Sequence, residues 1–188
     1  VLNLNLKLNQ VTAALDASTV YGSTEKLART LREYQGGRLR ATIINGDYVL
    51  PPVDPDRRDC ISDEHGDECF VAGDQRVNQY TGLTVVHVVW LRLHNKYANR
   101  LARLNPDWDD EHLYQETKKI ISALIQHITY NEYLPSVLGP YLMEEYGLLP
   151  LTSGYSYTYD PQVKLQVTNE FATAAFRYGH SLVRNYNE

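Results

Sequence analysis

A glycine followed by a histidine near the end of the chain, Gly179 and His180, has the residue types of a metal-binding site. Thr168 or Asn169 can cap a helix that leads to them. A single apolar face at three- and four-residue spacing supports that helix: Phe171, Ala174, Ala175, Tyr178 and Leu182. Gly179 costs such a helix roughly 1 kcal/mol against alanine, which indicates a close backbone approach by another group. A flat macrocycle lying over the helix, with its iron on Nε2 of His180, would account for both residues, and a hydrogen-bonded core histidine is the alternative.

A second candidate is Arg76, which stands just ahead of a long apolar helix. An arginine in such a place needs an anionic partner. The partner is either Asp74, in an ion pair, or a bound ligand over which the guanidinium is placed. His87 and His94 lie farther along the same helix, about 10 Å apart, and we interpret both as packed, hydrogen-bonded residues rather than as a metal pair.

Oxygen-bearing groups alternate near the start of the chain, at Thr12, Asp16 and Ser18, with a free carbonyl at Ala14. In an extended loop a period of two places these groups on one side. Ca²⁺ takes six to eight oxygen ligands of this kind, so the loop is a candidate calcium site. A helix cap and turn built on Asp16 and Ser18 is the alternative.

The two cysteines, Cys60 and Cys69, lie nine residues apart in a polar loop. This spacing suits a small disulfide loop in an oxidising compartment. A zinc site would need His65 and a carboxylate in addition, so it ranks below the disulfide.

The composition is that of a globular protein, with 43% hydrophobic and 22% charged residues in 188. No apolar run is long enough to cross a membrane, and a net charge of −5 gives no electrostatic reason to expect nucleic acid as a partner. We see no signal peptide. The first and last residues fall in mid-pattern, so we expect a piece of a longer protein.

The positions of caps and breakers predict a mainly α fold with long irregular loops. A short strand at residues 1–8 is followed by a helix from Ser23 or Thr24 to Tyr34 and by irregular chain over 38–72. A long helix then ends at Pro106, another begins at Asp109 or Asp110, and a short helix runs from Gly139-Pro140 to Gly147. Residues 148–167 form a loop before the last helix. The face expected to be buried on the long helix is Leu83, Val86, His87, Trp90, His94, Tyr97 and Leu101.

Four segments in this order resemble the animal haem peroxidases of the peroxidase–cyclooxygenase superfamily. They are LDASTVYG at 15–22, AGDQRVN at 72–78 with LRLHN at 91–95, LYQETKKII at 113–121 running on to TYNEYLP at 129–135, and FRYGH at 176–180. The resemblance covers nearly the whole chain and is greater to invertebrate peroxidases of the peroxinectin and chorion kind than to the mammalian leukocyte enzymes. It implies that residues 1–188 are the central-to-proximal part of a multi-helix haem peroxidase domain.

Carried over residue by residue, the resemblance implies that His180 is the proximal iron ligand and that Arg76 is the distal arginine. Arg177 matches an arginine beside a haem propionate. The Ca²⁺ loop would use Thr12, the Ala14 carbonyl, Asp16 and Ser18, with one further aspartate outside this chain, and Cys60 and Cys69 match a local disulfide. The cofactors implied are haem b and Ca²⁺.

Two positions depart from the mammalian pattern. Gln79 stands where a glutamate forms an ester with a haem methyl, and Tyr80 stands where the leukocyte enzyme has a methionine bonded to a vinyl group. Neither covalent link can form with these residues. The distal histidine is expected upstream of residue 1, in another segment or chain, and the asparagine that accepts the proximal ring proton is expected downstream of residue 188.

The function implied is reduction of hydrogen peroxide with oxidation of small phenolic donors or halides, in a secreted protein that takes part in the response to oxidative stress. Neither nucleic acid nor membrane is expected as a partner, and this chain alone is expected to be inactive. A non-catalytic peroxidase-homology module with a binding or structural role is the alternative.

Overall fold

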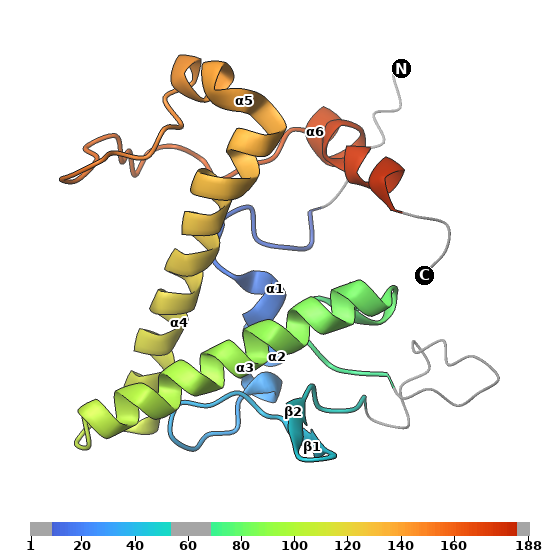
Figure 1. The fold of residues 1–188 in the computed structure, drawn as a ribbon, viewed down its shortest axis with the longest axis vertical. Helices are drawn as coiled ribbons and strands as arrows, with labels where there is room; N and C mark the ends of the chain where they lie inside the picture. Colours follow the sequence, from blue (N-terminus) through green and yellow to red (C-terminus); the bar gives the residue numbers. More distant parts are fainter. Residues whose placement is uncertain (1–8, 54–68, 184–188) are drawn as a thin grey trace.

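The computed structural model describes residues 9–53 and 69–183. It is mainly α, as predicted (Figure 1). The predicted strand at residues 1–8, Cys60 and His65 lie outside the described residues. The elements follow in chain order: α1 Ser18–Tyr21, α2 Glu25–Leu31, β1 Thr42–Ile44, β2 Asp47–Val49, the 3₁₀ helix η1 Gln75–Asn78, α3 Thr81–Leu104, α4 Asp110–Ile128, the π-helical turn η2 Thr129–Tyr133, α5 Leu134–Glu145, α6 Asn169–Thr173 and the 3₁₀ helix η3 Ala175–Leu182.

The long helices α3 and α4 meet at the turn between them, and α4 continues through η2 into α5 (Figure 1). Asp109 caps α4 through its side chain, which accepts a hydrogen bond from the His112 N–H at 2.8 Å. Pro135 has no N–H for the next i→i−4 bond, and the π-helical turn lies directly before it. Gly139, at φ 78°, interrupts α5 ahead of Pro140. A helical segment therefore begins at Gly139-Pro140, as predicted.

The core lies where α1, α2 and the β1–β2 hairpin pack against α3 and α4. At its centre the rings of Tyr21, His94 and Tyr114 meet edge to face or tilted, with centroids 5.4–5.9 Å apart. The β1–β2 hairpin is antiparallel and turns at Asn45-Gly46, both with positive φ. The buried apolar residues of the described chain are Ala17, Val20, Tyr21, Leu31, Leu39, Leu50, Ala72, Val77, Leu91, Ala98, Leu113, Tyr114, Ile121 and Met143.

The buried face of α3 differs from the predicted one. His94 is buried as expected, but the other buried positions are Leu91, Asn95 and Ala98, while Leu83 and Val86 are exposed. The buried positions begin at Leu91 and lie in the part of α3 that carries His94, whose ring packs against Tyr21 of α1 and Tyr114 of α4.

The predicted helix ends were also wrong at two places. α2 ends at Leu31, three residues before Tyr34, and Arg32 turns to an extended conformation with ψ 144°. The last helix is not continuous, because Ala174, at φ −129° and ψ −69°, separates α6 from η3. No residue of α6 or η3 is buried, so the predicted apolar face has no described partner that would hold a regular α-helix.

Candidate functional site

Arg76 lies on η1, immediately before α3, and is paired with Asp74. The carboxylate accepts from Arg76 Nε at 3.0 Å and from Nη2 at 2.6 Å, and it also caps η1 through the Arg76 N–H at 2.9 Å. The guanidinium therefore holds the pKa of Asp74 below its usual range. The Arg76 side chain remains 63% exposed, so one edge of the guanidinium is fixed and the rest faces outward.

The segment that carries Arg76 is held by the core. Val77 is buried, and its carbonyl accepts from Thr84 Oγ1 at 2.6 Å. Gly73 lies so close to α1 that a Cβ there would be 2.5 Å from the Thr19 carbonyl oxygen and 2.6 Å from that of Ser18. A glycine is thus required for the 72–74 segment to touch α1, and the position of Arg76 depends on that contact.

His180 lies on η3, and its Nδ1 is 2.9 Å from the carbonyl oxygen of Arg177. Because a carbonyl only accepts, Nδ1 must carry the proton, which leaves the lone pair of the neutral ring on Nε2. Nε2 is the nitrogen through which an exposed histidine can ligate a metal. A Cβ on Gly179 would meet no described atom within 4 Å, so no described part of the chain makes the predicted close approach there.

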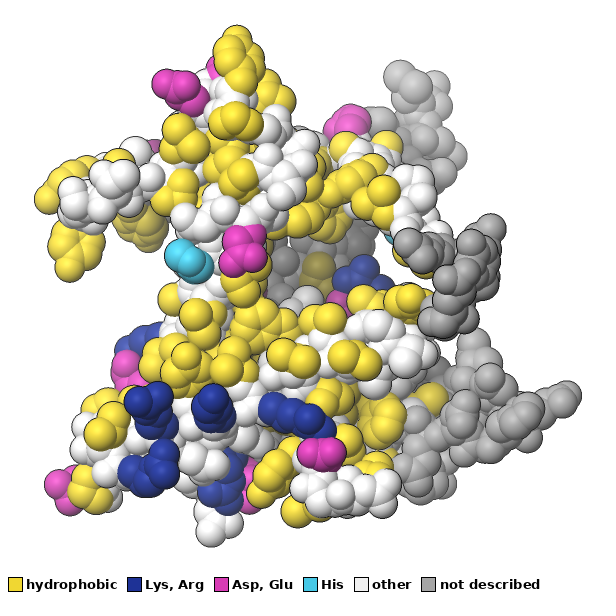
Figure 2. Space-filling model, in the orientation of Figure 1, with side chains coloured by type: hydrophobic (Ala, Val, Ile, Leu, Met, Phe, Trp, Pro, Cys, Tyr) yellow, Lys and Arg dark blue, Asp and Glu magenta, His cyan; other side chains and the backbone are white. Residues whose placement is uncertain are grey.

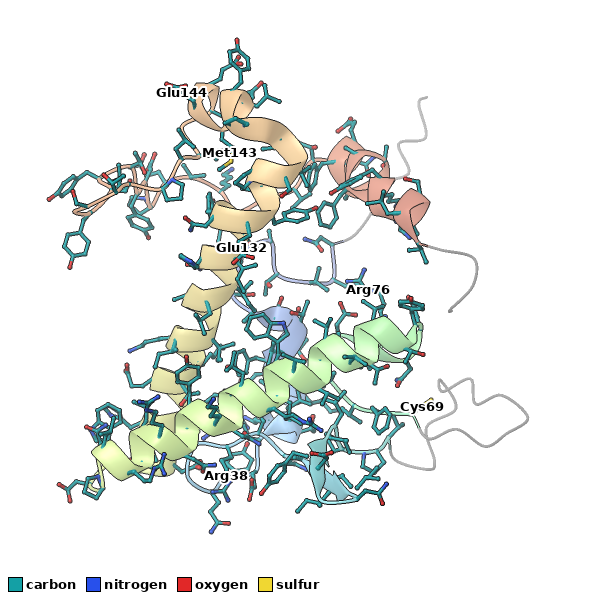
Figure 3. The ribbon with its side chains drawn as sticks, viewed as in Figure 1. Arg38, Cys69, Arg76, Glu132, Met143 and Glu144 are labelled. Carbon is teal, nitrogen blue, oxygen red and sulfur yellow. The ribbon has the colours of Figure 1, made fainter. Side chains whose placement is uncertain are left out.

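Arg76 and the η3 helix that carries His180 lie on opposite sides of a hollow. In Figure 2 the surface is hollowed between α6–η3 above and α3 below. Figure 3 places the Arg76 side chain at this hollow, under α6. Among the described residues, η3 is joined to the rest of the molecule by one side-chain hydrogen bond, between the hydroxyls of Tyr178 and Tyr133 at 2.7 Å.

The residues at the hollow fit a flat apolar cofactor with a metal at its centre. η3 carries His180 with an unprotonated ring nitrogen, η1 carries the Arg76 guanidinium, and Phe171 of α6 and Phe176 of η3 have exposed rings 5.2 Å apart. Arg177 is also exposed, as a cation near His180 in sequence. Gln79, at the end of η1, is exposed and donates its N–H to the Arg76 carbonyl at 3.0 Å.

The predicted calcium loop brings two of its oxygens together. Thr12 Oγ1 donates to Asp16 Oδ1 at 2.9 Å, and the Ser18 N–H donates to the same oxygen at 3.0 Å. Asp16 therefore forms the turn that was the alternative to a calcium site. Asp16 Oδ2 and the Ala14 carbonyl have no hydrogen bond in the described chain. Hard oxygens so arranged suit Ca²⁺, although they are fewer than its full ligand set.

Sequence reasoning missed the residues that hold this loop. Ser122 donates to the Asp16 carbonyl at 3.1 Å, and Gln126 donates to the Leu15 carbonyl at 2.8 Å. Both are on α4, one turn apart, and are polar positions beside an apolar face. The i, i+4 spacing of Ser122 and Gln126 could have indicated that they act together. Spacing alone does not predict which loop they bind.

The histidines of α3 are packed, as predicted. His94 is fully buried, accepts at Nδ1 from the Tyr21 hydroxyl at 2.7 Å, and donates from Nε2 to the Gly37 carbonyl at 2.8 Å. His87 donates from Nδ1 to the Leu83 carbonyl at 2.7 Å, while its buried Nε2 has no hydrogen-bond partner. No group of three or more His, Cys, Asp or Glu that could hold a metal occurs within residues 9–53 and 69–183.

A cluster around Arg32 was also not predicted from the sequence. This buried residue follows the last residue of α2 and lies against the first turn of α4. Its guanidinium pairs with Asp110 at 2.7 Å and with Glu111, and it stacks 4.0 Å from the centroid of the Tyr114 ring. Burial raises the pKa of Tyr114 to about 12. The cluster joins the end of α2 to the start of α4 and explains the early end of α2. Its role is structural.

Cys69 is half-buried, and its carbonyl accepts from the Val53 N–H at 2.8 Å. Because Cys60 lies outside the described residues, its disulfide with Cys69 stays a prediction. None of the described helices is long and apolar enough to cross a membrane.

The chain is similar to known proteins over nearly its whole length. The family model for "Animal haem peroxidase" matches residues 3–187. Chorion peroxidase of Drosophila melanogaster is 44% identical over 182 residues, which cover 97% of this chain and 22% of that protein. The human peroxidasin homolog is 45% identical over 183 residues, which cover 94% of this chain and 12% of that protein. Among solved structures, peroxidase A from Dictyostelium discoideum superposes with a TM-score of 0.70 at 35% identity, over 88% of this chain and 30% of that one. The chain thus spans less than a third of each of these proteins.

Proposed function

The chain belongs to the animal haem peroxidase family, and on that premise we propose that it supplies the Arg76 and His180 sides of a haem peroxidase site. The observation that carries the proposal is the hollow with Arg76 below it and the His180 segment above it (Figures 2 and 3). The enzyme would reduce hydrogen peroxide and oxidise phenolic donors or halides. Bound haem would supply the iron at which peroxide is cleaved and electrons are transferred.

In this proposal His180 is the proximal ligand. The hydrogen bond from Nδ1 to the Arg177 carbonyl fixes the tautomer and directs the Nε2 lone pair outward. A hydrogen-bonded Nδ1 proton also makes Nε2 a more basic ligand. Arg177 would place its cation near a propionate.

Arg76 would act on the peroxide side. Its guanidinium stays protonated at every accessible pH, and Asp74 fixes one edge of it. The remaining N–H groups can stabilise negative charge that develops on a peroxide oxygen. A general base is also needed to take the first peroxide proton, and we assign that role to a histidine outside residues 1–188.

Gln79 and Tyr80 lack the chemistry for the two covalent haem links of the mammalian enzymes. We propose that haem b is held at these two positions without covalent bonds. Gln79 is exposed beside Arg76, where its amide can donate a hydrogen bond to the cofactor instead.

We also assign Ca²⁺ to the loop of Thr12, Ala14, Asp16 and Ser18. The loop leads into α1, and α1 touches Gly73, three residues before Arg76. An ion that fixes this loop would therefore stabilise the position of Arg76. Together with the Cys60–Cys69 disulfide, this assignment favours a secreted protein, because disulfides persist in oxidising compartments.

The test is haem absorbance and peroxide-dependent oxidation of a phenol by the complete protein. His180→Ala should sharply change haem occupancy or the Soret band and abolish turnover. Arg76→Ala should keep haem and lower the rate by about two to three orders of magnitude.

Two matched controls separate these roles from folding. Arg29→Ala removes another exposed arginine that pairs with a carboxylate, that of Glu25, and His127→Ala removes another exposed histidine. Both should leave the spectrum and the rate unchanged. Loss of the haem spectrum in His87→Ala but not in His180→Ala would refute the assignment, and absence of any haem in the complete protein would favour the non-catalytic module.

A further inference from the structure

The second half of α3 carries a row of cations that the proposed peroxidase site does not use. Arg92, Lys96, Arg100 and Arg103 follow at spacings of four, four and three residues, and all are exposed. At 100° per residue they fall on one side of the helix, along about 16 Å of its axis. The 24 residues of α3 contain no Asp or Glu, although the whole chain has a net charge of −5.

The row borders a cleft of about 770 Å³ formed by α3, the β1–β2 hairpin and the chain before it. Arg92 and Lys96 line the cleft from α3, Arg38 and Arg40 line it from the chain before the hairpin, and Glu33 is the one carboxylate among the described residues that line it. Figure 2 shows the dark-blue side chains gathered over this part of α3 and below it, and Figure 3 shows Arg38 beneath the helix. We call these six cations the basic groove: Arg38, Arg40, Arg92, Lys96, Arg100 and Arg103.

Most of the positive charge of the basic groove is not neutralised within the described chain. The charge of Arg38 is neutralised, because its guanidinium forms a bidentate pair with the Glu33 carboxylate. Arg92 lies 3.8 Å from Asp47, an exposed and weak pair, and donates to the Tyr48 carbonyl at 2.6 Å.

The other four cations of the basic groove form no ion pair with a carboxylate of residues 9–53 or 69–183. Arg40 donates only to the Thr30 carbonyl, at 3.0 Å. No hydrogen bond or ion pair within the described residues involves the side chains of Lys96, Arg100 or Arg103. At least four positive charges therefore face solvent together, which favours an anionic ligand.

We propose that the basic groove binds a sulfated polysaccharide. A linear row of cations that begins in a concave cleft at Arg92 and Lys96 and continues beyond it along α3 suits an extended polymer with regularly spaced anionic groups, whereas a flat membrane surface would not reach the floor of the cleft. Asn99, Thr42 and Tyr48 line the same cleft and offer amide and hydroxyl groups to sugar hydroxyls, contacts that an acidic peptide would use less fully. The groove lies on the second half of α3, whereas Arg76 precedes the first residue of that helix.

The test measures binding of a heparin-derived oligosaccharide to the complete protein by calorimetry at several salt concentrations. We expect binding that weakens as salt rises, because the charges involved are exposed. The triple variant Lys96→Gln, Arg100→Gln, Arg103→Gln should weaken binding about tenfold or more. These side chains are exposed, so the fold should be kept, as circular dichroism can verify.

The matched control is Lys26→Gln, Lys119→Gln, Lys164→Gln, which removes the same charge from exposed positions elsewhere. It should bind within about twofold of the parent, because its three lysines lie outside the basic groove, whereas a non-specific attraction set by total charge would weaken equally in both triple variants. Replacing Arg100 and Arg103 by lysine should retain binding. Equal losses in the two triple variants would overturn the groove assignment. Equal or tighter binding of polyglutamate or of phosphatidylserine vesicles would overturn the choice of polysaccharide.

Discussion

The ring of His94 should make the stability of this protein fall steeply between pH 6.5 and pH 4. Burial lowers the pKa of His94 from 6.5 to about 4, and the nearby Arg32 cation acts in the same direction. In the folded protein the ring is neutral, since Nδ1 accepts from Tyr21 and Nε2 donates to Gly37. The unfolded chain therefore binds a proton to this ring at a higher pH than the folded chain does.

The size of the effect follows from that difference in pKa. At pH 7 both states are neutral and the full stability is present. As the pH falls below 6.5 the unfolded state is protonated first, so the free energy of unfolding decreases until the pH approaches 4. A pKa that moves from 6.5 to about 4 corresponds to roughly 3 kcal/mol over this interval. This is a large fraction of the stability of a typical domain.

The variant His94→Gln isolates this contribution, because an amide offers one acceptor and one donor but does not titrate in this range. Urea unfolding of parent and variant, followed by tryptophan fluorescence at pH 7, 6, 5 and 4, should show a smaller pH dependence in the variant by roughly 3 kcal/mol. Carboxylates such as Glu33 and Asp74, whose pKa is lowered by hydrogen bonds from Arg38 and Arg76, affect both proteins alike and cancel in the comparison. Identical pH dependence in the two proteins would refute the buried neutral histidine.

Three further perturbations test other contacts. Tyr21→Phe removes the donor to His94 and leaves a buried Nδ1 without a partner, so urea unfolding should show a loss of about 1–3 kcal/mol. Gly73→Ala forces a Cβ to 2.5 Å from the Thr19 carbonyl oxygen, and the melting temperature should fall by an amount equivalent to about 1–3 kcal/mol. Asp16→Ala removes the acceptor of two hydrogen bonds and the proposed Ca²⁺ ligand, so the melting temperature should drop and chelator should lower it no further. An unchanged calcium content in that variant would show that the ion lies elsewhere.

Local signals in the sequence were sufficient where the chain itself determines the structure. The cap at Asp109 depends on a side chain and a backbone N–H three residues away, so the start of α4 could be predicted. The break at Gly139 follows from a positive φ, which is a property of that one residue. The packed state of His94 was predicted from its apolar neighbours at helical spacing.

Features that depend on distant partners could not be predicted in the same way. The buried face of α3 is selected by α1 and α4, and periodicity does not tell which of two adjacent apolar stripes they cover. The early end of α2 follows from the pairing of Arg32 with Asp110 and Glu111, almost eighty residues away. At the candidate site, residue types and their positions identified Arg76 and His180 as candidates. The contact of Gly73 with α1, which connects the predicted calcium loop to the segment of Arg76, could be found only from the structure.

The two sides of the candidate site differ in what holds them. Arg76 is attached to the core through Val77, Asp74 and the Gly73 contact, so its position is determined without any ligand. The η3 helix that carries His180 has no buried residue, and it is joined to the rest of the described chain by the ring contact of Phe176 with Phe171 and by one exposed side-chain hydrogen bond between tyrosine hydroxyls. In the proposed site, a cofactor bound at His180 would add to the few contacts that order this side of the molecule. On the proposed function, haem binding and ordering of η3 are expected to be one coupled process, whereas the Arg76 side would be formed beforehand and would contribute a preorganised charge.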